Sequence, residues 1–259
     1  MKLRVISALV LLPPMIFILV KGGSALAILV LTASIIGIFE FSRAMGERIS
    51  KNETYILYVI TVLNMFALYM GMKSQTAVIL FALLMIEGVL VVTERANPEN
   101  AVYAVFTYIY VSLSLSCIYA VSKDSRYFFW YIFIFSMITD TFAYFSGYFF
   151  GKHKLSSKLS PKKTVEGSIG GMIACVAASV AYAAWSGKES LVTVAIFSAA
   201  GSIFSQVGDI FASAFKRWAG IKDYGNLIPG HGGVMDRVDS IAFSSLYVFI
   251  LMQFYKQLN

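Results

Sequence analysis

The sequence predicts an all-α, polytopic integral membrane protein. Its 259 residues are 58% hydrophobic and only 14% charged, which is far more apolar than a soluble globular domain. A helix needs about 20 apolar residues to cross a hydrocarbon core of roughly 30 Å. About nine runs of that length are present. They favour helices over a β-barrel, whose strands would alternate apolar and polar residues.

The predicted spans follow one another through short polar connections. We interpret the first as a retained, kinked helix, because Pro13 and Pro14 interrupt it and no small-residue cleavage site is evident. Cys117 and Cys175 fall inside apolar runs and predict neither a disulfide framework nor a metal cluster. The runs cover residues 3–20, 24–41, 55–72, 76–93, 101–121, 127–150, 168–186, 190–215 and 238–255.

Lysine and arginine are distributed unequally between the two sides of the membrane. With nine spans, the N-terminus and the loops after spans two, four, six and eight share one side, which holds most of these cations. The positive-inside rule makes that side cytoplasmic. The net charge of +7 therefore follows from topology and does not indicate nucleic-acid binding. The loops after spans six and eight hold more cations than orientation requires, which predicts an anionic ligand such as a nucleotide or a lipid headgroup.

Three segments follow from this pattern. Residues 1–93 hold the N-terminal spans, residues 94–135 the central spans, and residues 136–259 a catalytic membrane region. The chemistry is expected in two cytoplasmic loops of the last segment, residues 151–167 and 216–237.

Three carboxylates interrupt the spans away from their ends: Glu87, Asp140 and Asp209. A charge at the centre of a membrane helix costs about 2.5 to 3.5 kcal/mol, so each needs a partner or a function. Asp140 is either functional or a buried residue that fixes helix packing, and Glu87 fits a helix or subunit contact at least as well as catalysis. Asp209 has the strongest context, because a polar face at helical spacing runs along its span. That face contains Ser198, Ser202, Ser205, Asp209, Ser213 and Lys216.

This polar face of span eight has two interpretations. Serines in membrane helices often bond their own backbone or pack closely against neighbours. With a carboxylate in the same row, a water-filled or metal-filled cleft is the better prediction. Asp209 lies seven residues before Lys216, about 10 Å along the helix, and is therefore within reach of ligands from the cytosol.

The loop between spans six and seven contains a predicted phosphate site. Ser160 followed by Pro161 is typical of a helix N-cap and first helical residue. The amides near Lys162 and Lys163 would then lie at a helix N-terminus, which attracts phosphate. Thr164 adds a hydroxyl donor suited to phosphoryl oxygens.

The same loop leads into span seven through a pair of glycines. Gly167 and Gly171 have the small-xxx-small spacing that predicts close packing against another helix. A generic basic loop would explain the lysines but not their place beside this turn and glycine pair.

The loop between spans eight and nine combines cations, carboxylates and glycines. Oxygen ligands beside cations suit Mg²⁺ and a polyphosphate, since Mg²⁺ commonly bridges a few carboxylates to substrate phosphates. Taken singly, the acids could favour a helix N-terminus and the cations could anchor the interface. Their density in one short loop favours a site. The cations are Lys216, Arg217, Lys222 and Arg237, the carboxylates are Asp223, Asp236 and Asp239, and Pro229, Gly230, Gly232 and Gly233 surround His231.

This loop resembles the signature of the phosphatidate cytidylyltransferase (CDP-diacylglycerol synthase) family, bacterial type, and matches it at every specified position. Residues 140–147 and 160–167 resemble the family's second characteristic region, with Val165 where Trp is common. The N-terminal spans match only in hydropathy. The matched signature residues are Ser213, Phe215, Lys216, Arg217, Lys222, Asp223, Gly225, Ile228, Pro229, His231, Gly232, Gly233, Val234, Asp236, Arg237, Val238 and Asp239.

The resemblance implies transfer of a cytidylyl group from CTP to phosphatidate, giving CDP-diacylglycerol and pyrophosphate in phospholipid biosynthesis. It implies a multi-pass nucleotidyltransferase of the plasma (inner) membrane that depends on Mg²⁺, with a second cation left open. A homodimer is expected, and nucleic acid is not an expected partner. The lipid phosphate is already anionic, so positioning and charge neutralisation are the tasks left to the protein.

Individual roles follow from the same resemblance. Asp209 and Asp236 are predicted to be the principal metal ligands, with Asp223 as a further candidate. The substrate phosphates are expected at Lys216, Arg217, Lys222 and Arg237, completed by Lys162, Lys163 and Thr164. His231 is a catalytic candidate without an assigned role, and the other substrate-binding candidates are Asp140, Glu166, Ser205, Gly232, Gly233 and Asp239.

Two other functions remain open. A CTP-dependent polyprenol or lipid kinase would also pair a nucleotide with a membrane lipid, but it would release CDP instead of pyrophosphate. A cation-coupled transporter would explain carboxylates within spans, but the charges concentrate on one side and no inverted repeat is visible. A CDP-alcohol phosphotransferase is disfavoured because its Asp-Gly-x-x-Ala-Arg pattern is absent.

Overall fold

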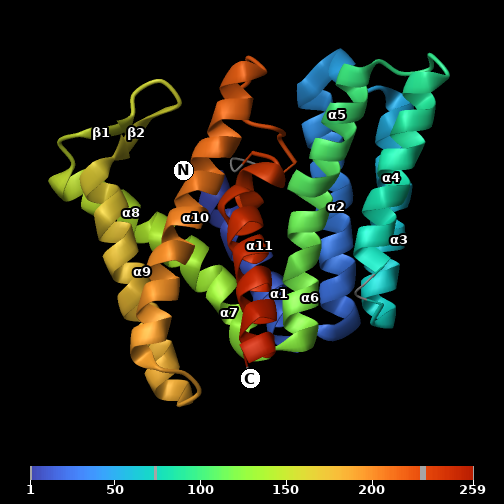
Figure 1. Ribbon diagram of the computed structural model, residues 1–259. Coiled ribbons are helices and arrows are strands. Elements are labelled where there is room, and N and C mark those ends of the chain that lie inside the picture. Colours follow the sequence, from blue (N-terminus) through green and yellow to red (C-terminus); the bar gives the residue numbers. More distant parts are fainter. Residues whose placement is uncertain (1, 73–74, 228–231, 259) are drawn as a thin grey trace. The chain divides into compact units, whose positions relative to one another are not determined.

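The computed structural model is α-helical with one short β-hairpin (Figure 1). It describes residues 2–72, 75–227 and 232–258. The helices are α1 (Lys2–Lys21), α2 (Gly23–Met45), α3 (Lys51–Met70), α4 (Gln75–Val92), α5 (Pro98–Thr107), α6 (Ser114–Asp124), α7 (Arg126–Phe133), α8 (Thr139–Phe150), α9 (Val165–Ser186), α10 (Leu191–Trp218) and α11 (Met235–Leu258). Short η1 (Gly46–Arg48) follows α2, and π-helical η2 (Tyr108–Leu113) and η3 (Ile134–Ile138) join α5 to α6 and α7 to α8.

Among the described residues, eight helical segments are long and apolar enough to cross a membrane. This confirms the predicted class of polytopic all-α membrane protein. The predicted first span corresponds to α1. In the described part of the chain, its apolar stretch Val10–Lys21 is too short to count as a membrane span. A ninth crossing therefore stays a prediction. Cys117 and Cys175 are buried free thiols.

The chain folds into two compact units whose boundaries differ from the three predicted segments. Unit 1 contains Met1–Lys123 and Ile221–Arg237, and unit 2 contains Asp124–Gly220 and Val238–Asn259. Most of the second predicted loop therefore belongs to the unit built from the N-terminal helices. We call Ile221–Arg237 the signature loop. Helix α11 begins in it and continues into unit 2.

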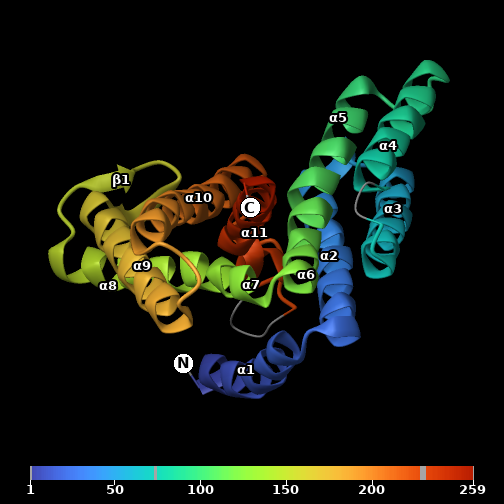
Figure 2. The ribbon, with the colours of Figure 1, turned by 60° about the horizontal axis from the view of Figure 1, so that its bottom comes forward.

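Unit 1 is a layer of helices in which α2 packs on α3, α3 on α4, and α5 on α4 (Figure 2). Helix α3 begins with a capping box, in which Ser50 Oγ accepts a hydrogen bond from Glu53 N and Glu53 Oε2 accepts one from Ser50 N. Glu87 of α4 is only 1% exposed, and no described residue forms a hydrogen bond with its carboxylate. Its burial within one unit favours a helix contact over a subunit contact.

Unit 2 is built around α8, α9 and α10, which pack against one another (Figure 1). The antiparallel hairpin of β1 (Lys154–Ser156) and β2 (Ser160–Thr164) joins α8 to α9. A Cβ atom added at Gly167 would lie 2.6 Å from the Ala143 carbonyl oxygen, and one at Gly171 would lie 2.7 Å from that of Thr139. The prediction that these glycines allow close helix packing is confirmed.

Replacing Gly171 by leucine should destabilise unit 2, because the new side chain would be forced into the backbone of α8. Overpacking of this kind costs about 1 to 3 kcal/mol. Thermal unfolding of the detergent-solubilised protein would measure the loss. Gly88→Leu is a matched control, since a Cβ at Gly88 meets nothing within 4 Å. Equal midpoints for the two variants would contradict the packing argument.

Candidate active site

The serines of the α10 polar face are packing residues over part of its length. Ser202 Oγ accepts hydrogen bonds from Thr139 Oγ1 at 3.0 Å and from Gln206 Nε2 at 3.3 Å. Ser198, Ser202 and Ser205 are fully buried, and the Ser205 hydroxyl has no hydrogen-bond partner among the described residues. The packing interpretation therefore holds for Ser202, whereas the charged end of the face takes part in a different arrangement.

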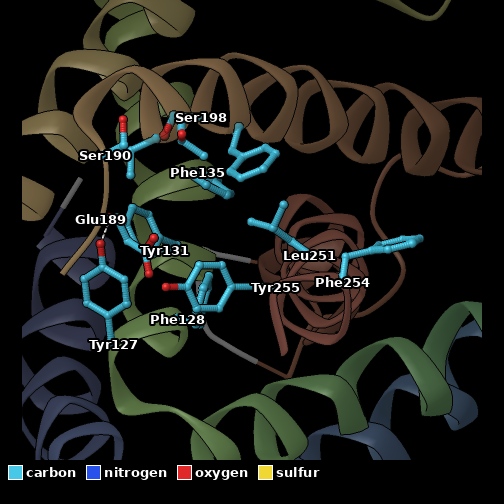
Figure 3. Close-up of a pocket in the computed structure, with 13 residues that line it drawn as sticks. Tyr127, Phe128, Tyr131, Phe135, Glu189, Ser190, Ser198, Leu251, Phe254 and Tyr255 are labelled. Carbon is cyan, nitrogen blue, oxygen red and sulfur yellow. Dashed lines mark hydrogen bonds between the residues drawn. The ribbon is translucent and has the colours of Figure 1, made fainter. Parts of the chain in front are cut away.

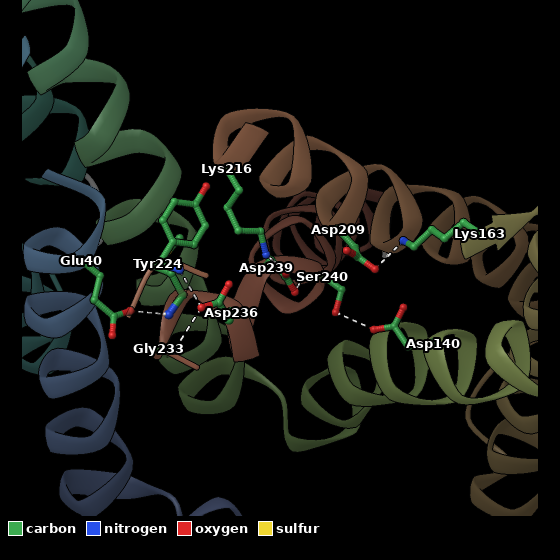
Figure 4. A network of polar contacts seen from close by, with 11 residues as sticks. Glu40, Asp140, Lys163, Asp209, Lys216, Tyr224, Gly233, Asp236, Asp239 and Ser240 are labelled. Carbon is green, nitrogen blue, oxygen red and sulfur yellow. Dashed lines mark hydrogen bonds and ion pairs between the residues drawn. The ribbon is translucent and has the colours of Figure 1, made fainter. Parts of the chain in front are cut away.

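At that end, three carboxylates and two ammonium groups of unit 2 come together (Figure 4). Lys163 of β2 forms an ion pair with Asp209 of α10, and each side chain is about a quarter exposed. Lys216 Nζ lies 3.9 Å from Asp239 Oδ2, and both side chains are largely buried. The Asp239 carboxylate is also close enough to the carboxylates of Asp209 and Asp140 for their like charges to repel it. We call Asp140, Asp209 and Asp239 the acidic cluster.

Close helix packing holds the acidic cluster together. A Cβ atom at Gly208 would lie only 2.8 Å from the Asp239 carbonyl oxygen, so the glycine beside Asp209 lets α10 approach α11. Ser240 Oγ donates a hydrogen bond to Asp140 Oδ2 at 2.9 Å, which joins α11 to α8. Four elements, α8, β2, α10 and α11, therefore supply the charged side chains.

The prediction that a helix begins at Pro161 is wrong. Residues Ser160–Thr164 form β2, and α9 begins at Val165. Thr164 is the N-cap, and its Oγ1 accepts a hydrogen bond from Gly167 N at 3.1 Å. A two-stranded hairpin has only edge strands, which tolerate proline. The predicted cradle of helix amides at the two lysines is therefore absent, and the threonine hydroxyl caps the helix.

The two lysines of β2 differ in their surroundings, because successive side chains of a strand point to opposite faces. Lys162 is exposed, whereas Lys163 is partly buried and pairs with Asp209. Glu166 fixes the base of the hairpin by accepting a hydrogen bond from Lys152 N at 3.0 Å. Only one lysine of the predicted pair thus reaches the acidic cluster, and substrate binding by Glu166 stays a prediction.

Asp236 folds the signature loop of unit 1 back on itself. Its Oδ2 accepts hydrogen bonds from Tyr224 N at 2.8 Å and from Gly233 N at 3.0 Å (Figure 4). Gly232 has a φ of +87°, a left-handed conformation that favours glycine. The structure therefore gives this aspartate a role in holding the loop, while its role as a metal ligand stays a prediction.

The remaining predicted residues are exposed or not described. Lys222, Asp223 and Arg237 are exposed in unit 1, and Arg217 is exposed near the end of α10. His231 lies outside the described residues. Their predicted roles in catalysis, phosphate binding and metal binding are neither supported nor contradicted by contacts.

Sequence reasoning missed two residues of α2 that hold the signature loop. Glu40 is 2% exposed and accepts hydrogen bonds from Val234 N at 3.1 Å and Met235 N at 2.9 Å. Arg43 Nη2 donates to the Tyr224 carbonyl oxygen at 2.9 Å. The only available signal was a carboxylate at the end of the second apolar run. Arg43 lies in the loop after span two, whose cations were used only to predict the orientation.

Unit 2 also contains a cavity of about 490 Å³ between α7, the start of α10 and the end of α11 (Figure 3). Aromatic side chains dominate its lining, which includes Tyr127, Tyr131, Phe135 and Tyr255. No predicted site residue lines it. The candidate site is therefore the charged arrangement, not this aromatic cavity.

The acidic cluster has the donor chemistry for a divalent cation. Mg²⁺ prefers oxygen ligands and usually combines one or two carboxylates with water and substrate phosphates. No group of three or more acidic, histidine or cysteine side chains in the described part of the chain is placed so that it could hold a metal ion by itself. The residues thus fit a cation that is shared with a phosphate ligand better than an all-protein metal site.

These features define a class: a multi-pass α-helical membrane protein with carboxylates and lysines clustered at its helices. Residues 2–255 match the sequence profile of the cytidylyltransferase family, and the chain belongs to that family. It is 29% identical over 260 residues to the phosphatidate cytidylyltransferase of Staphylococcus haemolyticus (strain JCSC1435). It is also 29% identical over 255 residues to that of Staphylococcus aureus (strain COL). Each alignment covers 94% of this chain and 95% of the relative, so the resemblance seen in the loops is confirmed over nearly the whole sequence.

Proposed function

We propose that this protein transfers a cytidylyl group from CTP to phosphatidate, giving CDP-diacylglycerol and pyrophosphate in phospholipid biosynthesis. Family membership and the names of the relatives support the reaction type. The observation that carries the proposal is the pairing of Lys163 with Asp209 and of Lys216 with Asp239 at membrane helices. Such a site offers cations to phosphates and carboxylates to a metal.

In the proposed reaction, an oxygen of the phosphatidate phosphate attacks the α-phosphorus of CTP. The bond from that phosphorus to the oxygen bridging to the β-phosphate breaks, and pyrophosphate leaves with the electron pair. Because the nucleophile is already anionic, no general base is needed. The protein contributes alignment of the reactants and neutralisation of their charge, which are the main terms in phosphoryl transfer.

The lysines and carboxylates of unit 2 have complementary tasks in this proposal. Lys163 and Lys216 would bind phosphate oxygens as point charges. Their ion pairs with Asp209 and Asp239 would be weakened when they do so. Asp209 and Asp239 would hold Mg²⁺, which when bound would supply further charge neutralisation. Asp236 and Asp223 remain further candidate ligands. Binding of a second cation also remains a proposal. Arg217, Lys222, Arg237 and Lys162 are proposed to hold the outer phosphates.

We also propose that the protein resides in the plasma (inner) membrane as a homodimer, with both catalytic loops in the cytoplasm. The unequal distribution of lysine and arginine supports this orientation. The electrophoretic shift of single-cysteine variants after treatment of intact cells with an impermeant maleimide would test it. Labelling of a cysteine at exposed Lys158 only after the cells are broken is the expected result.

Purified protein in mixed micelles should convert CTP and phosphatidate to equal amounts of CDP-diacylglycerol and pyrophosphate. Mass spectrometry of the lipid and an enzyme-coupled pyrophosphate assay would measure both products. Chelation by EDTA should abolish turnover, and added Mg²⁺ should restore it, because the anionic carboxylates would repel the triphosphate unless a cation is bound between them. Release of CDP with phosphorylation of a polyprenol would instead identify a lipid kinase. Cation uptake into vesicles without nucleotide chemistry would identify a transporter.

A further inference from the structure

The buried carboxylate of Glu40 is bound by the backbone where α11 begins. Its two oxygens accept hydrogen bonds from the adjacent amides of Val234 and Met235, one oxygen for each amide. Glu40 precedes Val234 by 194 positions and Met235 by 195 positions in the sequence. These long-range hydrogen bonds fix the end of the signature loop. A carboxylate buried this deeply is costly unless hydrogen bonds satisfy it, and the partial positive charge of a helix N-terminus adds to its stabilisation.

Two glycines of the signature loop provide independent support for this arrangement. A Cβ atom added at Gly225 or at Gly233 would lie 2.4 Å from Glu40 Oε1. Neither residue needs a left-handed φ. Glycine at both positions leaves the space that the carboxylate occupies, and a larger residue would push the carboxylate away from the loop. The two glycines come from opposite ends of the loop and meet the same oxygen.

Arg43, one helical turn after Glu40, holds the other end of the loop. Its guanidinium donates to the carbonyl oxygen of Tyr224, whose N–H donates to Asp236. Tyr224 is 1% exposed, and its ring lies 5.8 Å from that of Phe41 on the same helix. Charged side chains therefore bind both backbone polar groups of Tyr224. Helix α2 and Asp236 together fix the loop at its start and at its end.

We infer that Glu40 and Arg43 are positioning residues, which act on the reaction by holding the described parts of the signature loop, residues 221–227 and 232–237, with their exposed charges in place. The loop carries Lys222, Asp223 and Arg237, to which the proposed function assigns phosphates and metal, and the effect on activity rests on that function. A neutral or apolar residue would satisfy packing alone at position 40. The carboxylate has a specific reason to be there, because it can accept two amides that point in the same direction.

The inference is tested first without substrate, by hydrogen exchange and mass spectrometry on the full chain in detergent. In Glu40→Gln, the carboxamide oxygen replaces only one of the two carboxylate oxygens, and an NH₂ donor faces the amide that was bound by the other. We expect amides of residues 232–236 to exchange at least tenfold faster. Arg43→Met should accelerate exchange around Tyr224. Glu87→Gln is the matched control, because it removes a buried carboxylate of the same unit that forms no hydrogen bond with any described residue.

Turnover and thermal unfolding complete the test. We expect Glu40→Gln to lower kcat at least tenfold, with an unfolding midpoint similar to that of Glu87→Gln, and Arg43→Lys to recover part of the activity lost in Arg43→Met. Unchanged loop exchange in Glu40→Gln would overturn the inference. So would faster exchange throughout unit 1 with a parallel fall in midpoint, which indicates a general structural role. If the wild-type protein does not use CTP, the proposed function fails, while the exchange result still decides whether these residues hold the loop.

Discussion

Replacing Asp209 by asparagine should reduce the rate of CDP-diacylglycerol formation by on the order of 100-fold or more, a loss typical of removing one preorganised electrostatic group from an active site. The substitution preserves side-chain size and removes the negative charge that pairs with Lys163. In the proposed site, that charge also binds the cation shared with the triphosphate. Initial rates at saturating CTP, measured over a range of Mg²⁺ concentrations, should show both a lower kcat and a higher Mg²⁺ requirement.

Asp124→Asn is the matched control for this prediction. Asp124 also belongs to unit 2 and is bound to a lysine, with Lys256 Nζ 2.8 Å from its Oδ2, but it does not belong to the acidic cluster. Its replacement should leave the rate within about twofold, because Asp124 lies outside the acidic cluster. Equal losses in the two variants would show that the general charge of unit 2, not the acidic cluster, controls the rate.

A double-mutant cycle separates catalysis by Asp209 from a structural role as the partner of Lys163. If the ion pair only stabilises the fold, Asp209→Asn combined with Lys163→Met should be little worse than either single variant, because the same interaction is lost once. If the two side chains have separate tasks with metal and phosphate, the double variant should lose more activity than either. Unfolding midpoints measured on the same samples would show whether stability follows the same pattern.

The sequence predicts the transmembrane architecture well because a span depends on local quantities. Length and hydropathy within one segment are sufficient, and eight of the expected runs correspond to described helices that meet both criteria. The placement of Asp209 and Lys216 on the same polar face was also predictable, since both residues lie on one helix at helical spacing. The acidic partners from α8 and α11 depend on helix packing, which one sequence does not specify.

The loops show where local patterns are ambiguous. Ser160 followed by Pro161 fits a helix start, but proline is equally acceptable on an edge strand. In the structure these residues belong to strand β2, and the helix begins four residues after Pro161, at Val165. The contact of Glu40 with Val234 joins segments 194 residues apart and has no periodicity or motif to reveal it. The glycines at 225 and 233 were visible in the signature, but their physical reason is a carboxylate from a distant helix.

Asp236 and Asp239 should prove to have different tasks although they lie three residues apart on one helix. Asp236 binds the amides of Tyr224 and Gly233, whereas Asp239 interacts with Lys216 and with the other members of the acidic cluster. Asp239→Ala should lower kcat by on the order of 100-fold, because it removes a charge from the proposed metal and phosphate site. Exchange of the signature-loop amides should remain unchanged in this variant.

Asp236→Ala should instead release the loop, so that the amides of Tyr224 and Gly233 exchange at least tenfold faster, with a loss of turnover of similar size. Hydrogen bonds to a charged acceptor contribute roughly 1.5 to 3 kcal/mol, enough to account for that change. Because Asp236 and Glu40 hold the same loop, Asp236→Ala combined with Glu40→Gln should be less than additive in kcat. Asp239→Ala combined with Glu40→Gln should be additive. Additivity in both pairs would mean that Asp236 acts on the reaction directly, as a metal ligand would, and not through the loop it holds.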